Sequence, residues 1–189
     1  MIRWTLFAAL AALAALPSGA IAKERRASAE VIYALTRDDV TSLATRNGIV
    51  LSSAVEPSAA ERAANPEAGI GPTYIGITGK DSPLGEHAIV LTLRSCGEGG
   101  FGPDECLGLI IARPFRFAPA TRDQALSAVN HFHERTSFGR GFVSGDMFFV
   151  EYYLTTDQGI TEKHADRMLS EILAKVPDAR SAVAASMQR

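Results

Sequence analysis

The stretches that decide the fold are AIVLTLRSC at residues 88–96, GEGGFGPDE at 97–105 and CLGLIIARPFRF at 106–117. Apolar residues fall at every second position of the first run, which is the period of a β-strand with one buried face. Because the linker between the runs is short and rich in glycine, we expect a long antiparallel hairpin. Pro114 has no backbone donor, so the far end of the second strand should lie at an edge or a bulge.

Residues 1–22 have the three-part pattern of a cleavable secretory leader. Arg3 precedes an apolar run from Trp4 to Leu16, and the sequence A-I-A at 20–22 fits a small-residue cleavage site. Pro17 breaks the run short of the roughly 20 apolar residues that a membrane-spanning helix needs. We therefore expect cleavage near Ala22, a mature protein in the bacterial periplasm or outside the cell, and no integral membrane span; a retained amphipathic anchor is the alternative.

Cys96 and Cys106, the only two cysteines, flank the linker of the hairpin. In an oxidising compartment they predict a structural disulfide across the mouth of the hairpin. The alternatives are a redox dithiol or half of a metal site. A redox pair usually has the spacing C-x-x-C and a zinc site needs about four ligands, so the disulfide is favoured.

Charge and length restrict the classes of partner. The chain carries 19 basic and 21 acidic residues, and cleavage removes only Arg3 from these, so the mature protein is weakly acidic. Nothing in this balance favours nucleic acid or anionic lipid as a partner. The length suits one domain with a full hydrophobic core that needs no metal to fold.

Turn and capping signals predict the order of the elements. Thr36, Thr121 and Thr161 stand where helix N-caps are expected, and apolar residues follow each at helical spacing. The expected strands are residues 49–55, 73–78, 88–96, 106–117, 141–144 and 147–156. This order predicts an α+β domain, an antiparallel sheet of about five strands with helices packed on one face.

The domain should span residues 23–178. Within it, residues 56–72 are rich in Ala, Pro and Glu without periodicity, which predicts a loop excursion. The closing helix should end at Pro177, and residues 179–189 should form a tail that is helical or disordered.

No group of residues predicts catalysis, a cofactor or a bound metal. His131 and His133 are two positions apart on a predicted helix, so they point to opposite sides and cannot share a metal ion. Glu151 lies in an aromatic strand, where a raised pKa would make it an acid or base, although such a residue more often faces solvent. We expect no enzyme activity.

The sequence MFFVEYYL at residues 147–154 raises a question about the second face of the sheet. One side of this strand belongs to the core, and the other carries Met147, Phe149, Glu151 and Tyr153. A sheet with helices on one side should be polar on the other, so an apolar second face predicts a ligand or dimer surface. The alternative is that residues 56–72 or the C-terminal tail cover it.

The sequences VNHFH at 129–133 and SFGRGF at 137–142 resemble the YbjN family of bacterial sensory transduction regulators. That family shows Ile-Asn-x-Trp-Asn ahead of Arg-Phe-x-Arg-Ala. Here Phe132 and His133 replace the Trp-Asn pair and Ser137 replaces an arginine. The resemblance covers roughly residues 35–176 and is strongest from Cys96 onward.

The resemblance implies a fold similar to type III secretion chaperones and no catalytic residue. Phe132, Phe138 and Phe142 would be packing positions, whereas Asn130 and Arg140 would bridge helix and strand or face a ligand. Because the family pattern places Arg140 just after a helix, we expect it to bind the helix-end carbonyls as a clamp.

Together these patterns predict an exported, non-enzymatic domain that binds a protein or an extended peptide, in envelope sensory or stress signalling. Binding would use strand addition at a sheet edge or a groove on the sheet face. We also expect a homodimer through the face of Phe149 and Tyr153. The alternative function is a periplasmic small-molecule sensor with a pocket between sheet and helices.

Overall fold

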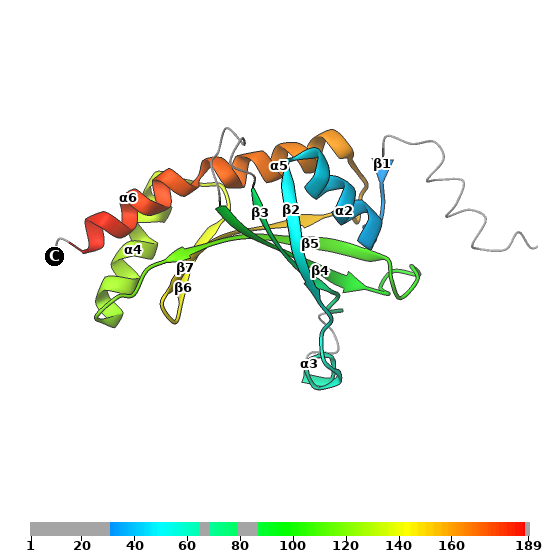
Figure 1. The fold of residues 1–189 in the computed structure, drawn as a ribbon, viewed down its shortest axis with the longest axis horizontal. Helices are drawn as coiled ribbons and strands as arrows, with labels where there is room; N and C mark the ends of the chain where they lie inside the picture. The colour runs from blue at the N-terminus through cyan, green and yellow to red at the C-terminus, as the bar shows by residue number, and fades with distance from the viewer. Residues whose placement is uncertain (1–30, 65–68, 79–86, 188–189) are drawn as a thin grey trace, which may run out of the picture.

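A computed structural model describes residues 31–64, 69–78 and 87–187 of the chain. The predicted leader, residues 1–22, lies outside these ranges. Within them the protein has one main antiparallel sheet with a layer of helices on one side (Figure 1). The predicted α+β class is therefore confirmed.

The main sheet has six strands in the order β2-β3-β4-β5-β7-β6. The predicted hairpin β4-β5 lies at its centre, and the strand predicted at residues 49–55 is present as β2, which pairs with β3 along most of its length. The sheet therefore has six strands where about five were expected. The strands are β2 Ile49–Val55, β3 Thr73–Thr78, β4 His87–Cys96, β5 Cys106–Arg116, β6 Arg140–Ser144 and β7 Met147–Thr155.

Pro114 marks the point where β5 has a neighbour on one side only. The pairing of β5 with β4 runs to Val90 opposite Ala112, whereas its pairing with β7 continues to Arg116. The local edge that the proline predicts is therefore present, at the end of an otherwise central strand.

A second, two-stranded sheet joins the start of the described domain to the segment that precedes α5 (Glu162–Ala174). It pairs β1 (Val31–Ile32) with β8 (Ile160–Thr161). Next to it, Leu35 exchanges two backbone hydrogen bonds with Cys106, of 2.8 and 2.9 Å. The start of the domain is thus fixed beside the disulfide hairpin.

Helices α2 (Arg37–Arg46), α4 (Arg122–Arg135), α5 (Glu162–Ala174) and α6 (Val176–Ser186) lie on the same side of the sheet (Figure 1). The predicted caps form: the Thr121 hydroxyl accepts from the backbone N–H of Gln124 at 3.2 Å. At α2 the capping is reciprocal, because the Asp39 carboxylate also accepts from the backbone N–H of Thr36 at 2.7 Å.

The core fills the layer between helices and sheet. Side chains from both layers are fully buried there, including Leu109, Ile111, Phe132, Phe148, Val150, Leu169 and Ile172. Arg113 of β5 lies in the same layer with only 1% of its surface exposed. Its Nε and Nη1 atoms have no hydrogen-bond partner in the described part of the chain.

The C-terminal residues belong to the domain. Residues 176–186 form α6, which packs against α4 and buries Ala179, Ala182 and Ser186 completely. Pro177 lies in the first turn of α6, where its missing N–H costs no hydrogen bond, so it starts this helix rather than ending the helical region. Of the two expected forms of the tail, helical and disordered, residues 179–186 adopt the helical one.

The excursion at residues 56–72 contains a short helix that the sequence does not predict. This helix, α3 (Ala59–Ala64), has no buried residue and projects away from the sheet (Figure 1). Since α6 lies on the helix side and α3 has no buried residue, neither helix covers the second face of the sheet within the described residues.

Candidate functional site

The side of the main sheet that faces away from the helices is named here the open face. Strand β7 shows the division most clearly. Phe148 and Val150 are fully buried under the helices, while Met147, Phe149, Glu151 and Tyr153 point to the open face. The face that the sequence singled out is therefore uncovered within the described residues.

Strand pairing extends this surface across the sheet. Arg140, Glu151, Ala112, Val90 and Ile75 are successive cross-strand partners, so all five lie on the open face. The same registers place on it five large apolar residues that are 40–61% exposed: Val50, Val55, Ile75, Ile77 and Tyr153. An apolar surface of this kind is typical of binding sites and not of a free sheet face.

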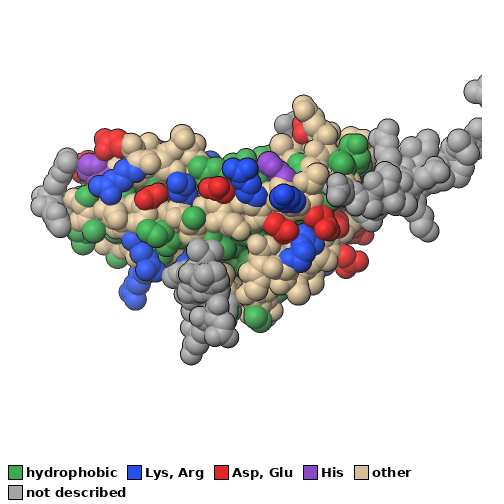
Figure 2. Space-filling model, turned by 90° about the horizontal axis from the view of Figure 1, so that it is seen from above, with side chains coloured by type: hydrophobic (Ala, Val, Ile, Leu, Met, Phe, Trp, Pro, Cys, Tyr) green, Lys and Arg blue, Asp and Glu red, His purple; other side chains and the backbone are tan. Residues whose placement is uncertain are grey.

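The helix side of the molecule has a different character. Seen from above, acidic and basic side chains are interspersed along it (Figure 2). An example is Arg46 of α2, which pairs with Glu162 and Asp166 of α5 at 3.3 Å each. Such a surface is typical of a solvated helix layer.

Arg140 is not the clamp that the sequence predicts. Its guanidinium lies on the open face, where Nη2 binds the Glu151 carboxylate at 2.8 Å. The group also lies 5.2 Å from the centre of the Phe142 ring, which in turn stacks on Phe149 at 4.9 Å between ring centres. Gly141, the next residue of β6, faces Phe132 and Phe148 in the core, so Arg140 lies on the opposite face of the strand, away from the helix layer.

A shallow depression of about 600 Å³ lies at one end of the open face. Its walls include Arg94 from β4, Ile110 from β5, Arg140 from β6, and Glu151 and Tyr153 from β7. The period of two along β4 puts Arg94 on the face opposite the buried Leu91 and Leu93. This pattern gave no sign that Arg94 lies near Tyr153, because that proximity depends on the strand order β4-β5-β7.

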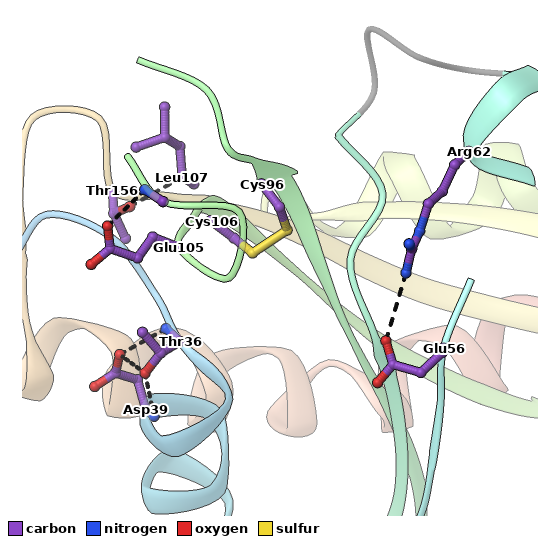
Figure 3. The surroundings of a disulfide bond; sticks show 10 residues. Thr36, Asp39, Glu56, Arg62, Cys96, Glu105, Cys106, Leu107 and Thr156 are labelled. Atoms are coloured by element: carbon purple, nitrogen blue, oxygen red, sulfur yellow. Dashed lines mark hydrogen bonds and ion pairs between the residues drawn. A yellow bond between two sulfur atoms is a disulfide. The ribbon is translucent and has the colours of Figure 1, made fainter. Parts of the chain in front are cut away.

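The predicted disulfide joins Cys96 to Cys106, whose Cα atoms are 3.8 Å apart (Figure 3). It borders a second cavity, of about 340 Å³, which Arg37, Glu56 and Arg62 also line. Glu56 pairs with Arg37 at 2.6 Å and with Arg62 at 3.8 Å. The hydrogen bond that Arg37 donates to the Glu56 carboxylate is the main cause that raises the pKa of Arg37 above its ordinary value.

The other residues of the family pattern separate into different environments. Phe132 is fully buried, and Phe138 stacks on Tyr152 at 4.7 Å between ring centres, as expected for packing positions. Phe142 packs on the open face and not in the core. Asn130 is exposed on α4.

The histidines contribute to local structure. His131 lies 3.0 Å from the Glu134 carboxylate, and Nε2 of His133 accepts from the backbone N–H of Gly141 at 3.3 Å. No group of three or more His, Cys, Asp and Glu suited to a metal ion occurs in the described ranges. In the same ranges, no helix is both long and apolar enough to cross a membrane.

An antiparallel sheet covered by helices on one side and open on the other, with an apolar open face, places the protein among one-sided α+β domains. The chain belongs to the YbjN family: the family model described as "Putative bacterial sensory transduction regulator" matches residues 82–184. This confirms the resemblance seen in the sequence. Comparison with curated proteins and with solved structures gives no match.

Proposed function

We propose that this protein is an exported, non-enzymatic regulatory domain that binds a protein or an extended peptide on its open face, in envelope sensory or stress signalling. The family described as sensory transduction regulators supports a regulatory role. The mode of binding is a groove on the sheet face and not strand addition, because the exposed apolar side chains lie on the face of the sheet.

One observation carries this proposal. Five of the nine large hydrophobic residues that are exposed in the described structure lie on the open face, from Val50 on the edge strand β2 to Tyr153 on β7. Isolated exposed apolar residues need no explanation, but a set that spans one uncovered face does. A partner that covers the face would remove this apolar surface from water.

The predicted leader and the disulfide support an extracytoplasmic location. Disulfides persist in the periplasm and outside the cell and are rare in the cytoplasm. The leader predicts that the mature chain starts near Lys23. Mass spectrometry of the protein from a periplasmic fraction should find this start, and a full-length chain confined to the cytoplasm would contradict export.

The test of binding compares two substitutions at similar exposure on opposite sides of the sheet. Ile75 is 40% exposed on the open face, and Leu126 is 50% exposed on α4. Immobilised mature protein should retain a specific partner from periplasmic extract, Ile75→Asp should lose it, and Leu126→Asp should keep it. Equal retention by both variants, or no specific partner for the parent protein, would contradict the proposal.

A further inference from the structure

The depression on the open face has an unbalanced positive charge. Arg140 and Glu151 neutralise each other at 2.8 Å, and the Glu151 side chain is only 12% exposed. Arg94, on the opposite wall, has no ion pair in the described part of the chain, and its Nε is buried without a hydrogen-bond partner. A guanidinium that lines a depression and has no ion pair favours an anionic ligand.

The local backbone fixes Arg94 beside Tyr153. Gly108 lies opposite Arg94 in the sheet, and the Tyr153 ring occupies the space that a Cβ at position 108 would need. Ser95, which follows Arg94, has a φ of 54°, a left-handed conformation that non-glycine residues adopt rarely. The disulfide at the next residue holds this segment in place.

The positive charge of the open face is concentrated at the depression, because the exposed Arg116 farther along the face pairs with Asp146 at 4.0 Å. The described strand residues of this face include three arginines, at positions 94, 116 and 140, and one carboxylate, Glu151. The chain as a whole has a formal net charge of −2. Since Arg140 pairs with Glu151 and Arg116 pairs with Asp146, the unpaired positive charge is that of Arg94, and the depression is a local basic site on an acidic protein. It is complementary to an acidic partner.

We infer that the depression binds a carboxylate side chain of an extended acidic peptide whose neighbouring residues are apolar. The carboxylate lies between the guanidiniums of Arg94 and Arg140, which provide forked donors. The apolar neighbours lie on Ile110, Val90 and Ile75, which continue from the depression along the face. A small inorganic anion would leave these side chains uncovered, so the apolar path is the reason to name a peptide.

This inference rests on the proposed function and names the chemistry of the partner. The probe is a dye-labelled peptide with two glutamates, each flanked by valines, and the control peptide has glutamines in their place. Fluorescence anisotropy with the disulfide-bonded mature protein should show binding of the glutamate peptide that is stronger by about tenfold and that weakens with salt.

Arg94→Gln should remove this preference, because the variant keeps the length of the side chain but loses the charge. Arg94→Lys should recover part of it, which shows that a loss in Arg94→Gln is not caused by misfolding. Arg116→Gln is the matched control: Arg116 is on the same face but does not line the depression, and its side chain is 85% exposed. The Arg116→Gln protein should bind the glutamate peptide with an affinity within about twofold of that of the parent protein.

Equal binding of the two peptides, or equal losses in Arg94→Gln and Arg116→Gln, would overturn the inference. If neither peptide binds while Ile75→Asp still abolishes partner capture, the acidic ligand is wrong and the proposed function stands. If partner capture also fails to depend on Ile75, both are wrong.

Discussion

Arg113 is the residue whose environment is hardest to reconcile with a stable core. Its side chain lies between the sheet and the helices, and Nε and Nη1 have no hydrogen-bond partner in the described structure. Burial, with a smaller contribution from the positive charge of Arg180, lowers the pKa of Arg113 to about 10. A buried cation without a partner destabilises the folded state.

The variant Arg113→Met should therefore be more stable than the parent protein. Methionine fills a similar volume without a charge, so we expect the free energy of unfolding to rise by about 1–3 kcal/mol in urea denaturation. The exposed Arg116 on the same strand provides the control, since Arg116→Met should change the free energy of unfolding by less than about 0.5 kcal/mol. A less stable Arg113→Met protein would show that the guanidinium has a stabilising partner.

The stability difference between the parent and Arg113→Met should depend on pH. Above pH about 10 the folded parent releases the Arg113 proton while the unfolded chain keeps it, so the unfolded state binds more protons. The destabilisation caused by the buried Arg113 charge is therefore fully present below pH about 10 and becomes smaller as the pH rises above it. Urea denaturation at pH about 8 and about 11 should show the difference becoming smaller.

The pair of Arg140 and Glu151 gives a second prediction at the residue scale. Arg140→Ala would leave the mostly buried Glu151 carboxylate without its partner, so the free energy of unfolding should fall by about 1–2 kcal/mol. Arg140→Lys should recover part of the loss. Adding Glu151→Gln to Arg140→Ala should also recover part of it, because the remaining side chain is neutral. If neither variant recovers unfolding free energy, the loss in Arg140→Ala comes from the stacking of Arg140 on Phe142 and not from the ion pair.

Among the elements, the contact of α4 with β6 depends on Gly141. A Cβ at this position would lie 2.7 Å from Cδ1 of Phe132 and 2.8 Å from Cζ of Phe148. Both rings are fully buried and cannot move freely, so Gly141→Ala should lower the free energy of unfolding by about 1–3 kcal/mol. Gly102→Ala is the control, because a Cβ there meets only ordinary contacts of 3.5 Å or more. Equal midpoints in chemical denaturation would contradict this packing.

The disulfide should stabilise the hairpin β4-β5 by closing a short ring in the unfolded chain. The double variant Cys96→Ala with Cys106→Ala should lose about 2–3 kcal/mol of unfolding free energy. Dithiothreitol should lower the denaturation midpoint of the parent to the same extent and leave that of the double variant unchanged. A reductant effect on both proteins would point to a different cause.

Most elements could be predicted from the sequence because their signals are local. The caps at Thr36 and Thr121 and the alternation in the central hairpin each depend on residues close together in the chain. The environments of Arg140 and Arg94 could not be predicted, since they depend on which strands become neighbours. The sequence did not predict helix α3, because this helix has no buried residue and therefore no amphipathic pattern.

For the whole molecule, the open face predicts self-association as well as partner binding. We expect the mature protein to form a dimer at high concentration that dissociates on dilution, because pairing two open faces would cover Phe149 and Tyr153. Light scattering should show a monomer for Tyr153→Glu and a dimer for the matched variant Leu126→Glu. A monomeric parent at high concentration would contradict this dimer.

The two outer strands of the sheet have a consequence for solubility. Strand β2 carries a bulge between Leu51 and Ser53, and β6 has only five residues. A bulged edge and a short edge both present a poor template for the backbone hydrogen bonds of another chain. The protein can therefore expose a large apolar surface to a partner while resisting edge-to-edge growth into fibrils, so that its aggregation should be limited to closed, reversible assemblies.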